Sequence, residues 1–141
     1  MKKILSLLAA FLMLASTASA TISAAVIPDG DIAAPCYDYT NSITSTLSIS
    51  NGKASCVTTI YGISGTTTKI VVTQYLEKKN GRYWDEVESW TNSFDNWWCN
   101  DVNTYTITES GTYRLRSVAT VYSGSKSEEV KITSTEKSVV I

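Results

Sequence analysis

The stretch from Ser93 to Asp101, SFDNWWCND, places aromatic, amide, acidic and thiol side chains close together. Trp97 and Trp98 are adjacent, and adjacent side chains of an extended chain point to opposite sides, so we expect one indole to pack on the protein and the other to face water. An exposed indole beside amides and carboxylates can stack on a sugar face, or it can anchor a protein partner. The residues that we expect to contact such a ligand are Phe94, Asp95, Asn96, Trp97, Trp98 and Asn100.

The same segment is rich in side-chain oxygens, which are the ligands that calcium prefers. They come from Asp95, Asn96, Asn100, Asp101 and Asn103. Their spacing matches no established calcium loop, and Asn and Asp are also ordinary turn formers, so calcium binding stays an open alternative.

A pair of carboxylates on one predicted strand raises the alternative of a glycoside hydrolase. Glu86 and Glu88 are two residues apart, about 6.6 Å in a regular strand, which falls within the carboxylate spacing of inverting glycosidases. Without a bulge they share a strand face, as Trp84 and Trp90 do. An exposed strand edge paired with Arg114 or Arg116 explains the same two acids without catalysis.

The composition narrows the chemistry further. Histidine is absent, which removes the usual general base, the usual metal ligand and every nucleophile pair that depends on an imidazole. We expect no enzymatic activity, no metal and no cofactor. The chain also has no basic stripe, so we expect no nucleic-acid partner.

Three cysteines, Cys36, Cys56 and Cys99, allow one disulfide and one free thiol. Cys36 and Cys99 fall in irregular segments near the same predicted end of the fold, whereas Cys56 lies within a strand on its apolar face. We therefore expect a Cys36–Cys99 disulfide and a buried, inert Cys56. The rival pairing, Cys56–Cys99, would put Cys99 in the core.

Residues 1–20 have the pattern of an export signal. Lys2 and Lys3 precede a short apolar run, and Ala18-Ser19-Ala20 is a small-residue cleavage site. Cleavage there takes the 12 basic residues to 10, against 13 acidic ones, a net charge of −3. We expect a secreted protein without a membrane anchor in its mature form, and a monomer.

The mature part shows short alternating apolar runs separated by turn signals, which is typical of an all-β sandwich. Asn51-Gly52 and Asn80-Gly81 are each predicted to close a hairpin. The predicted strand at 68–79 carries Ile70, Val72 and Leu76 inward, with Gln74 as the odd polar member of that face. The predicted organisation is a signal peptide (1–20), an irregular lead-in (21–41), a seven-stranded antiparallel domain (42–135) and a tail (136–141).

The segment SGTYRLRSVATVYSGSKSEEVKITST resembles the end of a fibronectin type III domain, within the immunoglobulin-like sandwiches. This resemblance implies that Tyr113 forms a tyrosine corner, its hydroxyl bonding the backbone upstream. The family's usual second-strand tryptophan is missing, and Cys56 lies near its place. The pieces GKASC, LEKKNGRYWDEVESW and GTYRLRS also resemble small secreted proteins of Gram-positive bacteria; neither resemblance supplies a reaction.

In such a sandwich, alternating strands bring loops together at two poles. One pole is predicted to collect residues 93–101, Gly62 to Thr66 and Ser123 to Ser125. Loops on a rigid support often carry function. The sequence therefore predicts a secreted, non-catalytic module that recognises an extracellular glycan or protein through an aromatic loop. A small bacteriocin-like effector is the first alternative, and the Glu86/Glu88 hydrolase is the second.

Overall fold

The computed structural model describes residues 36–141, and this part of the chain is all β, without a helix. No helix able to cross a membrane occurs in the described range. Its eight strands, one more than predicted, are β1 (Thr40–Ser50), β2 (Lys53–Gly62), β3 (Lys69–Asn80), β4 (Tyr83–Phe94), β5 (Trp98–Thr106), β6 (Gly111–Ser123), β7 (Lys126–Thr133) and β8 (Lys137–Val139).

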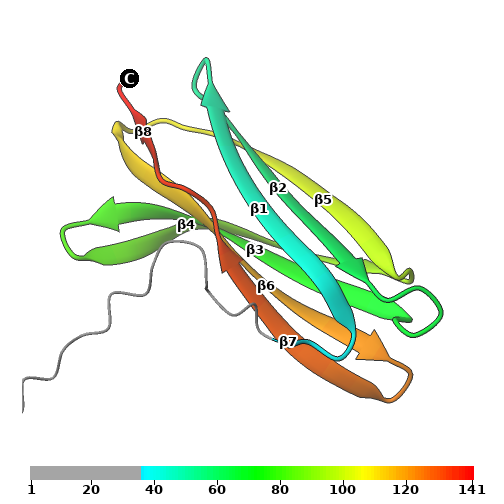
Figure 1. Cartoon of the computed structure of the whole chain (residues 1–141). Coiled ribbons are helices and arrows are strands. Elements are labelled where there is room, and N and C mark those ends of the chain that lie inside the picture. The colour runs from blue at the N-terminus through cyan, green and yellow to red at the C-terminus, as the bar shows by residue number, and fades with distance from the viewer. Residues whose placement is uncertain (1–35) are drawn as a thin grey trace, which may run out of the picture. The chain divides into compact units, whose positions relative to one another are not determined.

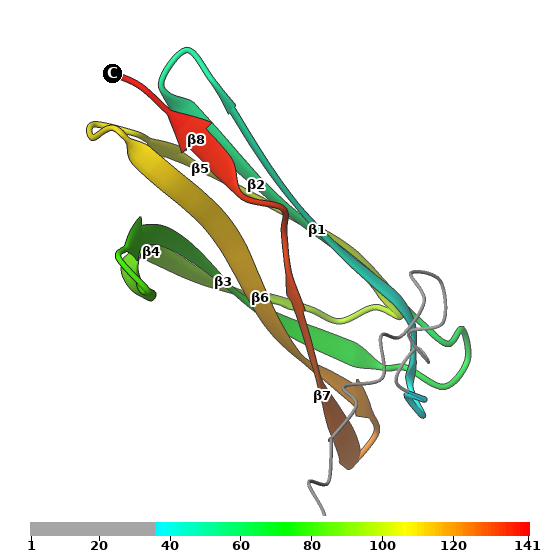
Figure 2. The ribbon, with the colours of Figure 1, turned by 60° about the vertical axis from the view of Figure 1, so that its left-hand side comes forward.

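The strands form two antiparallel sheets that face each other (Figures 1 and 2). One sheet has the order β1-β2-β5, and the other has the order β4-β3-β6-β7, with β8 also paired to β6. Two consecutive strands stay in one sheet where a tight hairpin joins them, and the chain changes sheet after β2, β4 and β5. The predicted all-β antiparallel architecture is confirmed.

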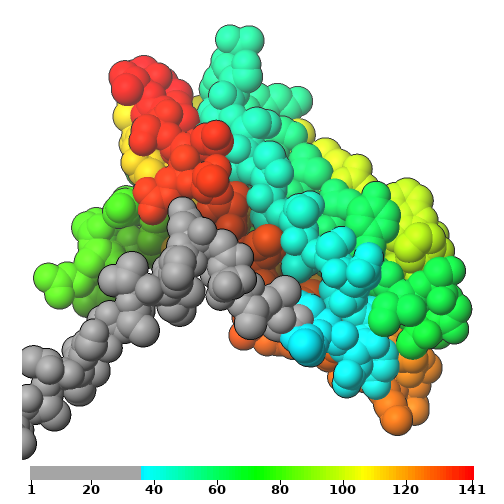
Figure 3. Space-filling view, in the orientation of Figure 1, coloured from blue at the N-terminus to red at the C-terminus, as the bar shows by residue number. Residues whose placement is uncertain are grey.

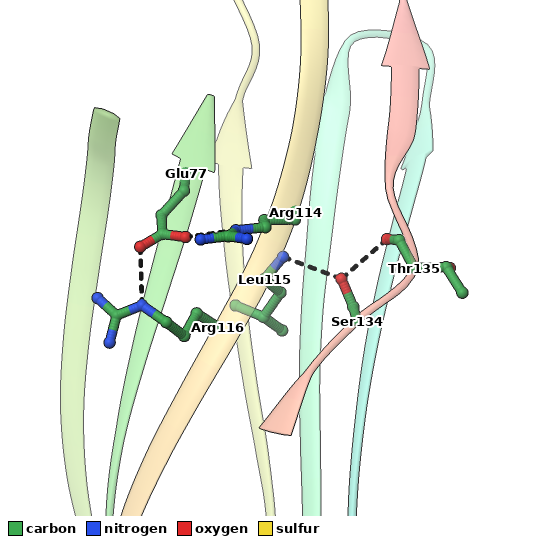
Figure 4. Close-up of polar contacts among 6 residues, drawn as sticks. All are labelled: Glu77, Arg114, Leu115, Arg116, Ser134 and Thr135. Carbon is green, nitrogen blue, oxygen red and sulfur yellow. Dashed lines mark hydrogen bonds and ion pairs between the residues drawn. The ribbon is translucent and has the colours of Figure 1, made fainter. Parts of the chain in front are cut away.

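The eighth strand, β8, lies within the segment predicted as the C-terminal tail (136–141). β7 leaves β6 at Thr133, and β8 pairs with the first residues of β6 instead. Between these two ladders, Ser134 bonds to Leu115 of β6. The Leu115 N–H donates to Ser134 Oγ at 2.9 Å (Figure 4), and the Ser134 N–H donates to the Leu115 carbonyl at 2.8 Å. The backbone groups of β6 thus keep hydrogen-bond partners between the β7 and β8 ladders.

The hairpin turns follow the predicted glycines. Asn51 and Gly52 both have positive φ, 50° and 72°, as a type I′ turn requires. In the second hairpin Asn80 pairs with Tyr83, so the turn residues are Gly81 and Arg82, with the positive φ of 60° at Gly81. Glycine at the first central position is the pattern of a type II′ turn.

The core divides into two hydrophobic clusters along the sandwich. One cluster consists of Leu47, Ala54, Cys56, Leu76, Ile107, Tyr113 and Leu115. The other consists of Ile60, Ile70, Val72, Cys99, Ala119, Val121 and Val130. Between them the inward positions are polar, and Thr58, Gln74 and Ser117 are completely buried. Gln74 therefore points inward, as its strand position predicts, and it lies among other buried polar side chains.

The tyrosine corner that the resemblance implied is present. The Tyr113 hydroxyl donates a 2.7 Å hydrogen bond to the carbonyl of Glu109, four residues upstream. The ring itself is buried in the first cluster. The bond joins the connection after β5 to the start of β6 and closes one end of the sandwich.

A β-bulge in β4 rearranges the outer face of the four-stranded sheet. Leu76 pairs with Glu88 but Glu77 pairs with Glu86, so Val87 is the extra residue. Beside the bulge, the buried Glu77 accepts hydrogen bonds from Arg114 Nε at 2.7 Å and Arg116 Nε at 2.8 Å (Figure 4). Both arginines face outward as predicted, but their partner is Glu77 and the predicted pairing with Glu86 or Glu88 is wrong.

Candidate functional site

The loops predicted to share one pole do meet there. The Gly62 N–H donates to the Trp97 carbonyl at 2.7 Å, which ties the end of β2 to the β4–β5 connection. The Gly124 N–H donates to Thr68 Oγ1 at 3.0 Å, which ties the β6–β7 turn to the β2–β3 loop. Figure 3 shows the β2–β3 loop (green) beside the β4–β5 connection (yellow-green) at one end of the domain.

Three exposed aromatic side chains gather at this pole, and we call Tyr61, Trp97 and Trp98 the aromatic cluster. Their exposed fractions are 43%, 37% and 42%, respectively. The Tyr61 ring lies 6.3 Å from the Trp98 ring, centroid to centroid, and the two planes are within 20° of parallel. It lies equally far from the Trp97 ring, which is tilted by 45°.

The prediction that one indole packs inward is therefore wrong. Cys99 takes the inward position at the start of β5, so its neighbour Trp98 must face outward. Trp97 precedes the strand, where strict alternation no longer applies, and both side chains remain exposed. Alternation within 53–62 could have placed Tyr61 on the outer face, but only the pairing of Tyr61 with Trp98 brings it to the site.

A surface pocket of about 380 Å³ adjoins the aromatic cluster and is lined by Phe94, Asp95, Asn96, Trp98, Cys99 and Asn100. The structure thus brings together all but one of the residues predicted to contact a ligand. The remaining one, Trp97, lies beside Tyr61, which stacks on the pocket residue Trp98.

The polar groups of the pocket have unused hydrogen-bonding capacity. The side-chain oxygen of Asn96 accepts from the Trp97 N–H at 2.8 Å, and that of Asn100 accepts from Thr59 Oγ1 at 2.9 Å. Both amide NH₂ groups then remain as donors. The Asp95 carboxylate also lines the pocket, where it offers acceptor oxygens. Donors, acceptors and an indole face are thus presented side by side.

The predicted Cys36–Cys99 disulfide is not formed, and all three cysteines of the described range are free. Cys99 points into the second core cluster, whereas Cys36 is exposed. The chain after Cys36 is held elsewhere, because the Asp38 and Tyr39 N–H groups donate to the Glu128 carboxylate on β7 at 2.8 and 2.9 Å. The entry segment is therefore anchored by a carboxylate on the other sheet.

The rival Cys56–Cys99 pairing is excluded by the register of the sheet. Cys56 lies opposite Asn103, four residues along β5 from Cys99, a separation of about 13 Å that no disulfide spans. Burial, with the nearby Asp101 carboxylate, raises the pKa of the Cys56 thiol to about 12. Burial raises the pKa of the Cys99 thiol to about 11. Both stay protonated and are unreactive packing groups.

The geometry supports neither the alternative calcium site nor the alternative Glu86/Glu88 carboxylate pair. Asn100 is exposed on the outer face of β5 and Asp101 is buried on its inner face, so the oxygen-bearing side chains of 95–103 do not converge on one cation. Because the bulge intervenes, Glu88 pairs with the inward-facing Leu76 and Glu86 with the outward-facing Glu77. The two acids therefore lie on opposite faces of β4, and the predicted same-face pair is wrong.

The two tryptophans of β4 are separated by the same bulge. Trp84 stacks under the Arg114 guanidinium, 4.1 Å from ring centroid to guanidinium carbon, on the outer face. Trp90 packs against the first core cluster on the inner face. The expectation that these two rings share a face is wrong for the same physical reason.

The position of the aromatic cluster depends on Gly62. A Cβ at this position would lie 2.6 Å from Thr67 Cβ, and Thr67 is held by bonds from the Ile63 N–H (2.9 Å) and to the Tyr39 carbonyl (2.6 Å). We expect Gly62→Ala to lower the free energy of unfolding by about 1–3 kcal/mol through overpacking. Chemical denaturation followed by tryptophan fluorescence measures this change.

The matched control is Ser64→Ala at an exposed position of the same loop, which we expect to change stability by less than about 0.5 kcal/mol. Equal midpoints for Gly62→Ala and Ser64→Ala would contradict the role given to Gly62.

No model of a known protein family matches this chain, and no curated protein matches it either. The predicted signal peptide (1–20) and most of the predicted lead-in (21–41) lie outside the described residues. Export from the cell therefore stays a prediction.

Proposed function

We propose that the mature chain is a secreted, non-catalytic binding module with a fibronectin-type-III-like or immunoglobulin-like fold. Two antiparallel sheets of order β1-β2-β5 and β4-β3-β6-β7 support this fold, and so does the Tyr113 hydroxyl bonded to the Glu109 carbonyl. The module acts as a monomer outside the cell and presents one pole of the sandwich to its ligand.

The single observation that carries the proposal is the exposure of three aromatic rings beside a polar pocket. Large exposed aromatic surface is unfavourable in water, and a contiguous group of such side chains marks a contact site. The support beneath it is rigid, because Tyr61 and Trp98 are directly opposite each other on paired strands. A binding surface on strands needs little ordering when the ligand arrives.

The chemistry of the pole favours a glycan. The C–H groups of a pyranose ring carry partial positive charge and pack on the face of an indole, whose quadrupole is negative there. The free amides of Asn96 and Asn100 donate to sugar hydroxyls, and the Asp95 carboxylate accepts from them. No cationic residue lines the pocket, so a neutral glycan is favoured over an acidic one.

A protein partner is the second candidate, because tryptophan and tyrosine are the residues that most often dominate binding energy at protein interfaces. The experiment that tests the proposal is an array of glycans and of extracellular proteins, probed with wild type and with Trp97→Ala/Trp98→Ala. We expect specific binding by wild type that the double variant loses while its circular dichroism spectrum stays unchanged. Equal signals from the two proteins would overturn the proposal.

A further inference from the structure

A polar layer lies inside the sandwich between the two hydrophobic clusters, away from the aromatic cluster. Thr58, Gln74 and Ser117 have no exposed surface, and Asp101 is 3% exposed. A core position normally carries an apolar side chain, since burying a polar group is costly unless it is hydrogen-bonded. This layer combines a hydroxyl, a carboxamide and a carboxylate, which can serve as nucleophile, acyl group and base in an acyl transfer.

The two sheets deliver these side chains to one place. Thr58 and Asp101 are directly opposite each other on β2 and β5. Gln74 and Ser117 are directly opposite each other on β3 and β6 of the other sheet. Across the gap, Gln74 Nε2 donates to Thr58 Oγ1 at 2.8 Å, and the Ser117 hydroxyl lies 2.7 Å from the same oxygen. The threonine hydroxyl is therefore held against the carboxamide of the facing sheet.

The carboxamide is held on both sides. Its oxygen accepts a 3.0 Å hydrogen bond from Asn103 Nδ2, and its nitrogen also donates to the backbone carbonyl of Asp101 at 3.1 Å. A donor on the carbonyl oxygen of Gln74 is placed where negative charge develops when a nucleophile adds to the carbonyl carbon. Asn103 thus occupies the position of an oxyanion stabiliser.

The carboxylate has one unused oxygen. Asp101 Oδ1 accepts from Asn92 Nδ2 at 2.8 Å and from Asn103 Nδ2 at 3.2 Å, whereas Oδ2 is buried without a partner. Burial raises the pKa of this carboxyl above its ordinary value, and the hydrogen bonds from Asn92 and Asn103 oppose that rise only in part. An ionised carboxylate in such surroundings is a stronger base than one in water.

We propose that Thr58 and Gln74 form an intramolecular ester that cross-links the two sheets. Asp101 Oδ2 has no hydrogen-bond partner and Oδ1 accepts only from Asn92 and Asn103, so the Asp101 side chain first turns Oδ2 toward the facing Thr58 hydroxyl. It then takes the hydroxyl proton, and Oγ1 bonds to the Gln74 Cδ. Asn103 stabilises the oxyanion that forms on Oε1. The Cδ–Nε2 bond then breaks, the proton on Asp101 passes to the departing nitrogen, and ammonia leaves. Thr58 is the nucleophile, Gln74 the acyl donor and Asp101 the base and acid; nothing is oxidised, and the carboxylate is regenerated.

Two physical features favour this step inside the sandwich. Fixing both reactants in one geometry supplies an effective concentration far above any in solution. Exclusion of water protects the product from hydrolysis. The ester would join β2 to β3 across the core in a domain where no disulfide joins the sheets within residues 36–141. The expected benefit is resistance to unfolding and to proteases outside the cell.

The test is the mass of the purified full chain, measured with its thiols reduced. We expect a mass about 17 Da below the sequence value, equal to one lost ammonia. Succinimide formation at Asn51-Gly52 or Asn80-Gly81 gives the same loss, so the change must be located. After trypsin, the peptides 54–69 and 70–78, which contain no Asn-Gly, should stay joined until hydroxylamine separates them.

Variants assign the roles. Asp101→Asn and Thr58→Val should restore the full mass, whereas Thr59→Val, the neighbouring outward-facing threonine, should keep the loss. A full-mass wild type whose two tryptic peptides separate without hydroxylamine would overturn the proposal and leave a hydrogen-bonded polar layer. The wild-type measurement alone decides this, so a variant that fails to fold does not affect the outcome.

Discussion

Replacing Glu77 by alanine is expected to lower the free energy of unfolding by about 3 kcal/mol. Glu77 is only 5% exposed and accepts hydrogen bonds from both Arg114 and Arg116. Removing one partner of a buried ion pair typically costs about 3–5 kcal/mol, because a desolvated charge is left uncompensated. Both guanidiniums keep partial contact with water, with side-chain exposures of 26% and 36%, which places the expected cost at the lower end.

We expect Glu77→Ala also to weaken the stacking of the two arginines on aromatic rings of the same face. The Arg114 guanidinium stacks on Trp84 and the Arg116 guanidinium on Tyr75, each 4.1 Å from the ring centroid. Without the carboxylate between them, the two cations repel each other and these stacks loosen.

Urea denaturation of wild type and Glu77→Ala measures the difference, and Glu129→Ala is the matched control. Glu129 forms an exposed pair with Lys131, so its loss should change stability by less than about 1 kcal/mol. Equal effects of the two substitutions would show that the Glu77 pairs contribute no more than a surface ion pair.

Replacing Trp98 by alanine is expected to weaken binding of the ligand identified on the array at least about 30-fold, a loss of about 2 kcal/mol. Trp98 both contacts Tyr61 and lines the pocket, so its removal takes away one wall and one stacking partner. The fold should tolerate the change, because the side chain is 42% exposed and contributes nothing to either core cluster.

Isothermal titration calorimetry measures this loss, with Trp84→Ala as the matched control. Trp84 is also a partly exposed tryptophan, but it lies on the other sheet under Arg114. We expect Trp84→Ala to bind within a factor of two or three of wild type, on the general expectation that distant surface changes have small effects. If both variants lose affinity equally, the effect is one of stability and the aromatic cluster is not the contact site.

Local patterns in the sequence predicted most of the strands. Alternation places Ile70, Val72 and Leu76 inward, and the positive φ of Asn51 and Gly52 follows from the turn that the dipeptide favours. These features depend on neighbouring residues alone. The meeting of the loops at one pole also followed, since it requires only that hairpin-connected strands alternate in direction.

The errors concern features that depend on distant residues. The disulfide prediction failed because Glu128 on β7 holds the entry segment at Asp38 and Tyr39, a contact with no local signal. Val87 bulges out of β4 opposite the Leu76–Glu77 step, and that one extra residue separates the faces of Glu86 and Glu88. A bulge is defined by the pairing of two strands, so the alternation pattern of one strand cannot reveal it.

The composition of the site was partly predictable and partly not. The pocket residues all fall within the segment from Phe94 to Asn100, so their mixture of aromatic and polar groups indicated a contact site. Tyr61 is 37 positions before Trp98 and joins it only through the β2–β5 pairing. Likewise Gln74 was identifiable as an unusual inward residue, but its contact with Thr58 arises from the packing of one sheet on the other.

The most direct test of the aromatic site is an NMR titration that follows the indole N–H signals while the identified ligand is added. The chain has four tryptophans, and all four lie within the described range. We expect the Trp97 and Trp98 signals to shift in proportion to occupancy while those of Trp84 and Trp90 stay in place. Shifts confined to Trp84 or Trp90, or binding with no shift at Trp97 and Trp98, would contradict a ligand site at this pole.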